Sequence, residues 1–292
     1  MDGIYSALLG CFDRDGFVNE EGVRALVHYN IDKMGVDGLY VNGTTGETFL
    51  MSMDMRKQVL RAVSNEAQGK IKLIAHVGGI CLDDVYELSS YAADLGYDSI
   101  SAVTPFYYKF TPDELRLYYT SIAEKSALPL IAYYIPGLSG VTMDTDTLCS
   151  ILDTQNVSGL KFTSNDFFTL ERLRSARPEK LIFSGFDEML LPMAVLGTNG
   201  SIGPTYNIIG NWAKKLYELV KAGDIESARS IQKHMNYVVS EVNDHGVYGT
   251  MKATLQLFGL PAGNTKAPMA PISFRQKEAA RRIKDYIQKN QL

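Results

Sequence analysis

Short segments rich in β-branched residues alternate with longer amphipathic segments along most of this chain. The strand candidates are eight in number, and they span residues 4–9, 38–42, 72–77, 99–104, 128–135, 157–162, 181–185 and 200–203. The amphipathic segments that follow them predict helices near residues 19–34, 52–67, 83–95, 111–126, 144–153, 165–176, 187–196 and 207–222. Because parallel strands need long crossover connections, which are usually helical, this order predicts a parallel sheet covered by helices.

The count of eight favours a closed (β/α)8 barrel, or TIM barrel, over an open doubly wound sheet. No early glycine-rich turn stands out as the dinucleotide site that is typical of the open fold. Three further helices are expected near residues 224–243, 247–258 and 275–290. We therefore expect a barrel domain over residues 1–222 and a helical extension over residues 223–292 that packs on the barrel.

Composition and charge exclude several classes of partner. Hydrophobic residues make up 46% of the chain, enough to bury a large core. The net charge of −4, with no long basic run, argues against a nucleic-acid or anionic-membrane partner. The sequence shows no secretory signal and no apolar run long enough to span a membrane. The three cysteines and four histidines lack metal-ligand spacing, so we expect a cytoplasmic protein without a metal site.

Lys161 is an unusual residue for its segment, because it lies in the otherwise apolar strand candidate Val157–Phe162. Lysine is rarely buried without a partner. One interpretation is a side chain that reaches solvent or an acidic partner at the end of the strand. The other is an amine whose pKa falls from about 10.4 towards neutrality, because burial disfavours the charged form. A neutral amine attacks carbonyl carbons, so the second interpretation predicts a nucleophile.

Tyr133 ends another strand candidate, and the ends of barrel strands are where active sites form. Its phenol is either an ordinary core side chain or a group that transfers protons near the amine. Successive residues of a strand point to opposite faces. If Tyr133 faces the barrel interior, Tyr134 is expected to face the helices.

Two more strand ends carry polar groups. The run Gly43-Thr44-Thr45-Gly46-Glu47 follows the second strand, and it is either an anion-binding turn rich in N–H and hydroxyl donors or an ordinary glycine-bounded turn. Asp187 and Glu188 follow the seventh strand. They either accept hydrogen bonds from sugar hydroxyls or simply favour the start of the next helix.

Taken in order, these segments resemble the dihydrodipicolinate synthase / N-acetylneuraminate lyase family, and its lyase branch in particular. The matching segments are Ala7-Leu8-Leu9, Gly38-Leu39-Tyr40-Val41, residues 43–47, residues 101–108, Tyr133 with Ile135-Pro136, Gly159-Leu160-Lys161, residues 185–188 and Thr205-Tyr206-Asn207. They cover nearly the whole barrel. The resemblance implies a homotetrameric barrel enzyme that forms a Schiff base and needs no metal or organic cofactor.

The resemblance also implies roles for individual residues. Lys161 would form the Schiff base, Tyr133 would transfer protons, and Thr44 and Thr45 would hold a pyruvate carboxylate. Tyr107 falls on a proton-relay tyrosine that the synthase branch donates across a subunit contact. The positions expected to contact the sugar chain are Thr163, Gly185, Asp187, Glu188 and Gly203.

Two positions bear on the substrate. Leu138 stands where the synthase branch usually has an arginine that grips a second carboxylate, so the resemblance favours a polyhydroxylated substrate. Pro204 stands where lyases commonly have a serine, so one hydroxyl is missing. The implied reaction is cleavage of N-acetylneuraminate, a 2-keto sugar acid, to N-acetylmannosamine and pyruvate. The alternatives are a 2-keto-3-deoxy sugar acid aldolase, a dihydrodipicolinate synthase and a non-catalytic regulatory barrel.

Overall fold

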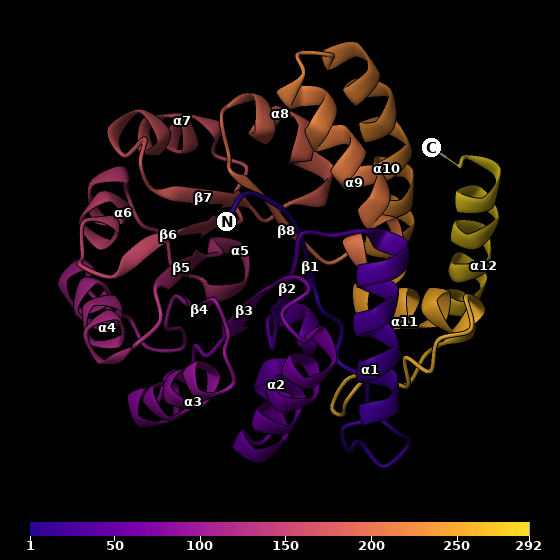
Figure 1. Cartoon of the computed structure of the whole chain (residues 1–292), viewed down its shortest axis with the longest axis horizontal. Helices are drawn as coiled ribbons and strands as arrows, with labels where there is room; N and C mark the ends of the chain where they lie inside the picture. Colours follow the sequence, from indigo (N-terminus) through magenta and orange to yellow (C-terminus); the bar gives the residue numbers. More distant parts are fainter. Residues whose placement is uncertain (292) are drawn as a thin grey trace.

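Eight parallel strands form a closed barrel in the computed structural model, which describes residues 1–291 (Figure 1). The strands are β1 (Gly3–Ala7), β2 (Gly38–Val41), β3 (Lys72–His76), β4 (Ser99–Val103), β5 (Leu130–Tyr134), β6 (Val157–Phe162), β7 (Leu181–Ser184) and β8 (Gly200–Gly203). They pair in chain order, and β1 also pairs with β8, with Gly3 opposite Gly200. This closure confirms the predicted (β/α)8 barrel and excludes the open sheet.

Helices follow the strands and surround the barrel (Figure 1). The helices that connect strands, or that follow the last one, are α1 (Glu20–Tyr29), α2 (Met53–Ala67), α3 (Leu82–Asp94), α4 (Pro112–Lys125), α6 (Thr145–Leu152), α7 (Phe167–Ala176), α8 (Leu190–Val195) and α9 (Tyr206–Lys221). Local sequence explains where several of them begin. Thr111 caps α4 in a reciprocal capping box with Glu114, and the Ser52 hydroxyl accepts a hydrogen bond from the Met55 N–H at the start of α2.

Short turns account for the differences from the sequence prediction. The expected helix 19–34 is α1 followed by a π-helical turn, η1 (Asn30–Met34), and the expected helix 187–196 is a 3₁₀ turn, η4 (Asp187–Met189), followed by α8. The short helix α5 (Pro136–Ser139) and the 3₁₀ turns η2 (Thr44–Gly46) and η3 (Thr48–Leu50) were not predicted. Elements of three or four residues are too short to show a hydrophobic period.

The strands bury both faces, with one set of side chains inside the barrel and another beneath the helices. The interior set is Tyr5, Ala7, Tyr40, Ile74, Val103, Ile131, Tyr133, Ile135, Phe183 and Ile202. Tyr134 belongs to the outer set and packs 5.6 Å from Phe162, ring centre to ring centre. The prediction that Tyr133 and Tyr134 face opposite ways is therefore confirmed, as the two-residue period of a strand requires.

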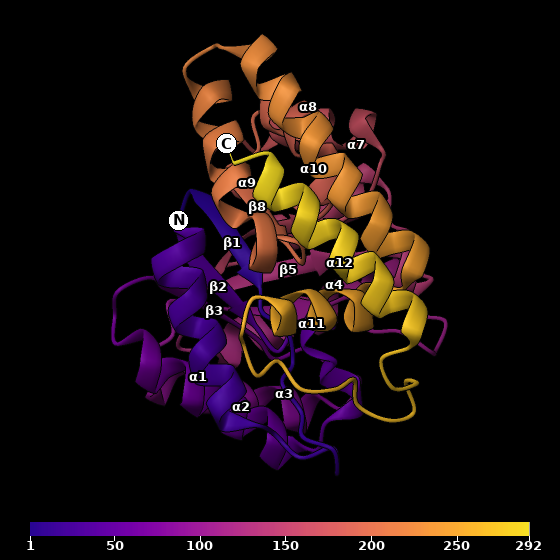
Figure 2. The same cartoon turned by 90° about the vertical axis from the view of Figure 1, so that its right-hand side faces the viewer.

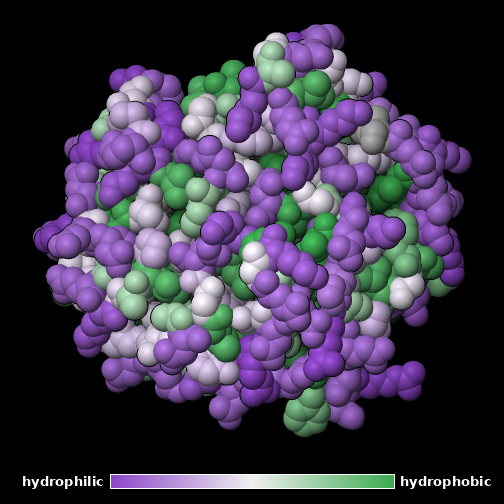
Figure 3. Space-filling view, in the orientation of Figure 1, coloured by the Kyte–Doolittle hydropathy of each residue, from purple (hydrophilic) through white to green (hydrophobic). Residues whose placement is uncertain are grey.

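The chain continues after the barrel with α10 (Ile225–His245), α11 (Val247–Leu257) and α12 (Phe274–Lys289), which confirms the three predicted helices. Figure 2 shows α10 and α12 running side by side, with α11 inclined to both. Hydrophilic side chains cover most of the face seen in Figure 3, and apolar ones show between them in small groups. None of the helices within residues 1–291 combines the length and the apolar character that a membrane span requires.

Candidate active site

A cavity of about 220 Å³ opens at the C-terminal ends of the strands, where active sites of this fold form. Residues of β5 and β6 and of the loops after β2, β7 and β8 line it, and α10 and α11 close one side. Eight of the ten predicted site residues line the cavity: Thr44, Thr45, Tyr133, Lys161, Thr163, Gly185, Asp187 and Glu188. Gly203 and Tyr107 do not line it.

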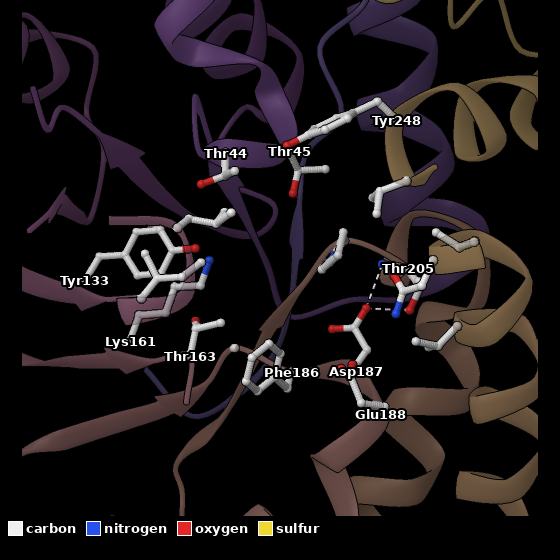
Figure 4. Close-up of a pocket in the computed structure, with 18 residues that line it drawn as sticks. Thr44, Thr45, Tyr133, Lys161, Thr163, Phe186, Asp187, Glu188, Thr205 and Tyr248 are labelled. Atoms are coloured by element: carbon white, nitrogen blue, oxygen red, sulfur yellow. Dashed lines mark hydrogen bonds between the residues drawn. The ribbon is translucent and has the colours of Figure 1, made fainter. Parts of the chain in front are cut away.

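Lys161 points from β6 into this cavity and lies against two tyrosine rings (Figure 4). It is 4% exposed, and its Nζ lies 4.0 Å from the centre of the Tyr133 ring and 4.3 Å from that of Tyr40. Burial lowers the pKa of Lys161 to about 7, and the charge of Asp187 opposes this fall. A large fraction of the amine is therefore neutral near pH 7, and the interpretation of Lys161 as a solvent-reaching lysine does not fit.

Tyr133 stands directly beside Lys161, because the two residues are partners in the register of β5 and β6. The Tyr133 side chain is buried, and its hydroxyl faces the side of the cavity that holds Thr44 (Figure 4). Burial raises the pKa of Tyr133, and the hydroxyls of Thr44 and Thr163 counteract part of this rise. A phenol in this place stays protonated at neutral pH and is able to hand a proton to a reacting group.

The run from Gly43 to Glu47 forms η2, a single 3₁₀ turn at the end of β2. Gly43 is required here, because a Cβ on it would lie 2.5 Å from the Tyr40 ring. The turn places Thr44 and Thr45 across the cavity from Lys161 (Figure 4). Hydroxyl groups across the cavity from a buried amine suit a carboxylate on the same small molecule. Anion binding at this turn stays a prediction.

Thr163 and Gly185 fit together beside Lys161. A Cβ on Gly185 would lie 1.7 Å from the Thr163 Oγ1, so no larger residue fits without moving that hydroxyl. Within residues 1–291 the buried Thr163 Oγ1 makes no hydrogen bond of good geometry, although it lies near enough to the Tyr133 hydroxyl to lower the pKa of Tyr133. A buried hydroxyl without a strong partner at a cavity wall is costly unless a ligand uses it, so Thr163 is available to a substrate.

Asp187 is buried, and its carboxylate bridges two loops rather than capping its own helix. Its Oδ2 accepts hydrogen bonds from the Thr205 N–H at 2.7 Å and the Thr205 hydroxyl at 2.5 Å (Figure 4). Asp187 also lies in the first turn of η4, as the helix-start interpretation predicts. Its Oδ1 has no partner within residues 1–291, and a Cβ on Gly203 would lie 1.7 Å from that oxygen. Gly203 thus leaves space for Asp187, and burial raises the pKa of Asp187 to about 7.

Tyr107 lies apart from the cavity within a single chain. It is 84% exposed, stacks edge-on against Tyr108, and has a positive φ of 79°, which is rare for a bulky residue. The structure of one chain therefore does not bring Tyr107 to Lys161. Its role across a subunit contact stays a prediction.

Sequence reasoning missed the part of the cavity that the C-terminal helices supply. Tyr248 and Val247 of α11, with three residues of α10, line the cavity. It also missed the partner of Glu47, which is the buried amine of Lys252. One signal was present in the sequence, because a lysine in the otherwise uncharged run 247–257 is unusual in the same way as Lys161. Within residues 1–291 no group of three His, Cys, Asp or Glu side chains is arranged to hold a metal ion.

A buried lysine with a depressed pKa, a tyrosine beside it and a hydroxyl-lined turn opposite it suit covalent carbonyl chemistry. The turn orients a carboxylate, the amine adds to an adjacent keto carbon, and the phenol moves protons. The class of protein that this fold and site define is a carbon–carbon lyase of the Schiff-base type.

Comparison with known proteins agrees with this class. The N-acetylneuraminate lyase of Fusobacterium nucleatum is 46% identical over 290 residues, which is 99% of this chain and 100% of that protein. Its crystal structure complexed with pyruvate superposes with a TM-score of 0.93 at 45% identity, covering 99% of this chain and 97% of the other. The structure of CdNal from Clostridium difficile in complex with mannosamine has a TM-score of 0.96 at 44% identity, covering 98% of each chain.

The sequence profile of the Dihydrodipicolinate synthetase family matches residues 1–287. This chain therefore belongs to that family, as the motifs of its strand ends predicted.

Proposed function

We propose that this protein cleaves N-acetylneuraminate to N-acetylmannosamine and pyruvate through an imine formed on Lys161. The observation that carries the proposal is the buried amine of Lys161 at the mouth of the barrel, whose pKa of about 7 leaves about half of it neutral near pH 7. The N-acetylneuraminate lyase of Fusobacterium nucleatum, at 45–46% identity over 99% of this chain, supports the same reaction.

The proposed reaction begins with the open-chain form of the substrate, whose 2-keto group is free. Thr44 and Thr45 bind the carboxylate and orient the neighbouring keto carbon towards the Lys161 amine. The amine adds, and loss of water gives a protonated imine. This cation accepts electrons from the bond between C3 and C4, which breaks as the C4 hydroxyl loses its proton.

Tyr133 is the proposed carrier of that proton, because its hydroxyl faces the cavity beside Lys161. A phenol with a raised pKa stays protonated, so it acts as a relay: it passes its own proton to the substrate carboxylate held by Thr44 and Thr45 as it takes the proton of the C4 hydroxyl. Protonation of the resulting enamine at C3 and hydrolysis of the imine release pyruvate and restore the amine.

The lining of the cavity favours a sugar acid over a dicarboxylic product. Lys161 is the only lysine or arginine among the described residues that line it, and Leu138 stands near the entrance where the synthase branch would hold an arginine. A second carboxylate would have no cation to bind. Asp187 and Glu188, together with Thr205, instead offer groups that bind hydroxyls.

The test is reductive trapping. Pyruvate with borohydride should add one reduced adduct per chain, and mass spectrometry of peptides should locate it at Lys161, while Lys161→Met should take up none. A wild-type protein without an adduct, or with the adduct elsewhere, would reject the proposal. A coupled assay of pyruvate release from N-acetylneuraminate and from shorter 2-keto-3-deoxy sugar acids then identifies the preferred substrate.

We also propose that the protein assembles as a homotetramer, as the family resemblance implies. The exposed Tyr107 in the loop between β4 and α4 is a candidate contact with a second copy. Light scattering after size-exclusion chromatography tests this. A monomer at micromolar concentration would exclude a role for Tyr107 at a neighbouring site.

A further inference from the structure

A buried ion pair joins the C-terminal extension to the turn that holds Thr44 and Thr45. Lys252 of α11 donates a hydrogen bond to the Glu47 Oε1, and neither side chain is exposed to solvent. The Lys252 amine also donates to the Asn264 carbonyl at 2.6 Å, and the other Glu47 oxygen accepts from the Lys266 N–H at 2.7 Å. Every charged atom of the pair is thus used, and the pair joins residues that are 205 positions apart in the chain.

Glu47 belongs to the anion-binding turn itself. Its N–H donates to the Thr44 carbonyl at 2.9 Å, and its backbone has a positive φ of 59°, which is uncommon for a residue other than glycine. The opposite side of the turn contacts the loop after β1, where the Gly10 N–H donates to the Thr45 carbonyl at 3.4 Å. The turn is therefore held between the loop after β1 and α11.

Tyr248 lies one helical turn before Lys252 on α11, so the two side chains share one face of the helix. Tyr248 lines the cavity, and Figure 4 shows its hydroxyl end pointing towards Thr45. No hydrogen bond joins the Tyr248 hydroxyl to the other cavity-lining residues drawn in Figure 4, so a ligand in the cavity can bind it. Burial raises the pKa of Tyr248, and the Glu47 charge adds to this rise, which keeps the phenol protonated as a donor.

We propose that the Glu47–Lys252 pair is a positioning device that fixes α11 on the anion-binding turn, so that the Tyr248 hydroxyl joins Thr45 in binding the substrate carboxylate. This inference rests on the proposed function, since it assumes that the carboxylate of a 2-keto acid binds at the turn. A buried pair of this kind gives little net stability, because the cost of removing both charges from water offsets their attraction. The consequence of the Glu47–Lys252 pair is therefore geometric, because the pair determines which face of α11 contacts the anion-binding turn.

The experiment compares the pyruvate concentration that half-saturates borohydride trapping in four proteins. They are the wild type, Tyr248→Phe, the double variant Glu47→Gln with Lys252→Met, and the control Arg282→Met. The double variant removes both charges together, because a single substitution would leave one buried charge unpaired. Arg282 pairs with Glu241 at 2.8 Å within the extension, far in sequence from the turn, so its variant loses an ion pair without touching Glu47.

Tyr248→Phe and the double variant should each raise the half-saturating pyruvate concentration on the order of tenfold, the effect of losing one hydrogen bond to a charged group. At saturating pyruvate the yield of adduct at Lys161 should match that of the wild type, and with the sugar acid KM should rise more than kcat falls. Arg282→Met should leave all these values unchanged.

An unchanged half-saturation in either Tyr248→Phe or a folded double variant overturns the proposal, even if the double variant melts at a lower temperature. If the double variant does not fold, the half-saturating pyruvate concentration of Tyr248→Phe alone tests the proposal. Failure of the wild type to form any adduct overturns the proposed function as well, so the two failures are distinguishable.

Discussion

Lys161 and Tyr133 occupy partner positions on adjacent strands, with the amine 4.0 Å from the centre of the phenol ring. The register of β5 and β6 alone brings the two side chains together, so no special backbone conformation is needed. The ring face buries the amine, and the hydroxyl stays in the cavity (Figure 4). One residue thus contributes both to the low pKa of the amine and to proton transfer.

The variant Tyr133→Phe separates these two contributions. The ring that covers Lys161 remains, so reductive trapping of pyruvate should proceed as in the wild type. Loss of the hydroxyl removes the proton carrier, so kcat for sugar-acid cleavage should fall about a hundredfold to ten-thousandfold. Cleavage at the wild-type rate would show that another group carries the proton.

The rate of imine formation should rise with pH through neutrality. The pKa of Lys161 is about 7, so roughly 10% of the amine is neutral at pH 6 and roughly 90% at pH 8. Trapping by cyanoborohydride at a fixed, low pyruvate concentration should therefore quicken about tenfold over this range and then level off. A rise that continues to pH 10 would mean that the amine keeps its ordinary pKa.

Asp187→Asn should move the midpoint of that pH profile to lower pH. The negative charge of Asp187 favours the protonated amine and raises the pKa of Lys161, so its removal lowers the pKa further. The matched control is Glu188→Gln, since Glu188 is not among the groups that shift the pKa of Lys161. The assignment fails if the control moves the midpoint and Asp187→Asn does not.

Gly203→Ala should disturb the bridge between Asp187 and Thr205, because the new methyl group would overlap the Asp187 Oδ1. We expect a loss of about 1–3 kcal/mol in the free energy of unfolding and a raised KM for the sugar acid. Gly137→Ala is the control, because a Cβ there meets nothing within 4 Å. Denaturant unfolding and initial-rate kinetics measure the two effects, and equal behaviour of both variants would contradict the role given to Gly203.

Pro204→Ser tests whether the missing hydroxyl limits activity on the longest substrates. Pro204 lines the cavity next to Thr205, and a serine there would add one donor. We expect kcat/KM for N-acetylneuraminate to rise by about threefold to tenfold relative to that for a shorter keto-deoxy acid, the effect of one neutral hydrogen bond. An unchanged ratio would show that position 204 does not contact the sugar chain.

The barrel and most of its site were predictable because both depend on local sequence. Short segments rich in β-branched residues, alternating with amphipathic segments, identified the eight strands, and a lysine within an apolar strand identified Lys161. The two-residue period of β5 gave the opposite directions of Tyr133 and Tyr134. In each case the signal lies within a few residues of the feature that it predicts.

The contribution of α11 was not predictable in this way. Its hydrophobic pattern indicated a helix, yet which face meets the barrel depends on a pairing between Lys252 and Glu47 across 205 positions. The pairing of Asp187 with Thr205 was not predictable for the same reason, because Thr205 lies in the loop after the next strand. Long-range polar pairs leave no periodic mark in the sequence.

The packed interior beneath Lys161 decides the order in which the products leave. Tyr5 and Phe183, with ring centres 5.4 Å apart and no exposure to solvent, plug the barrel below the cavity, so there is no passage through it. Substrate therefore enters and products leave through the same cavity opening. The pyruvate fragment, still bonded to the Lys161 amine, lies at the closed end of the cavity. The aldehyde sugar must depart first, so pyruvate should inhibit competitively against the sugar acid, and N-acetylmannosamine should not.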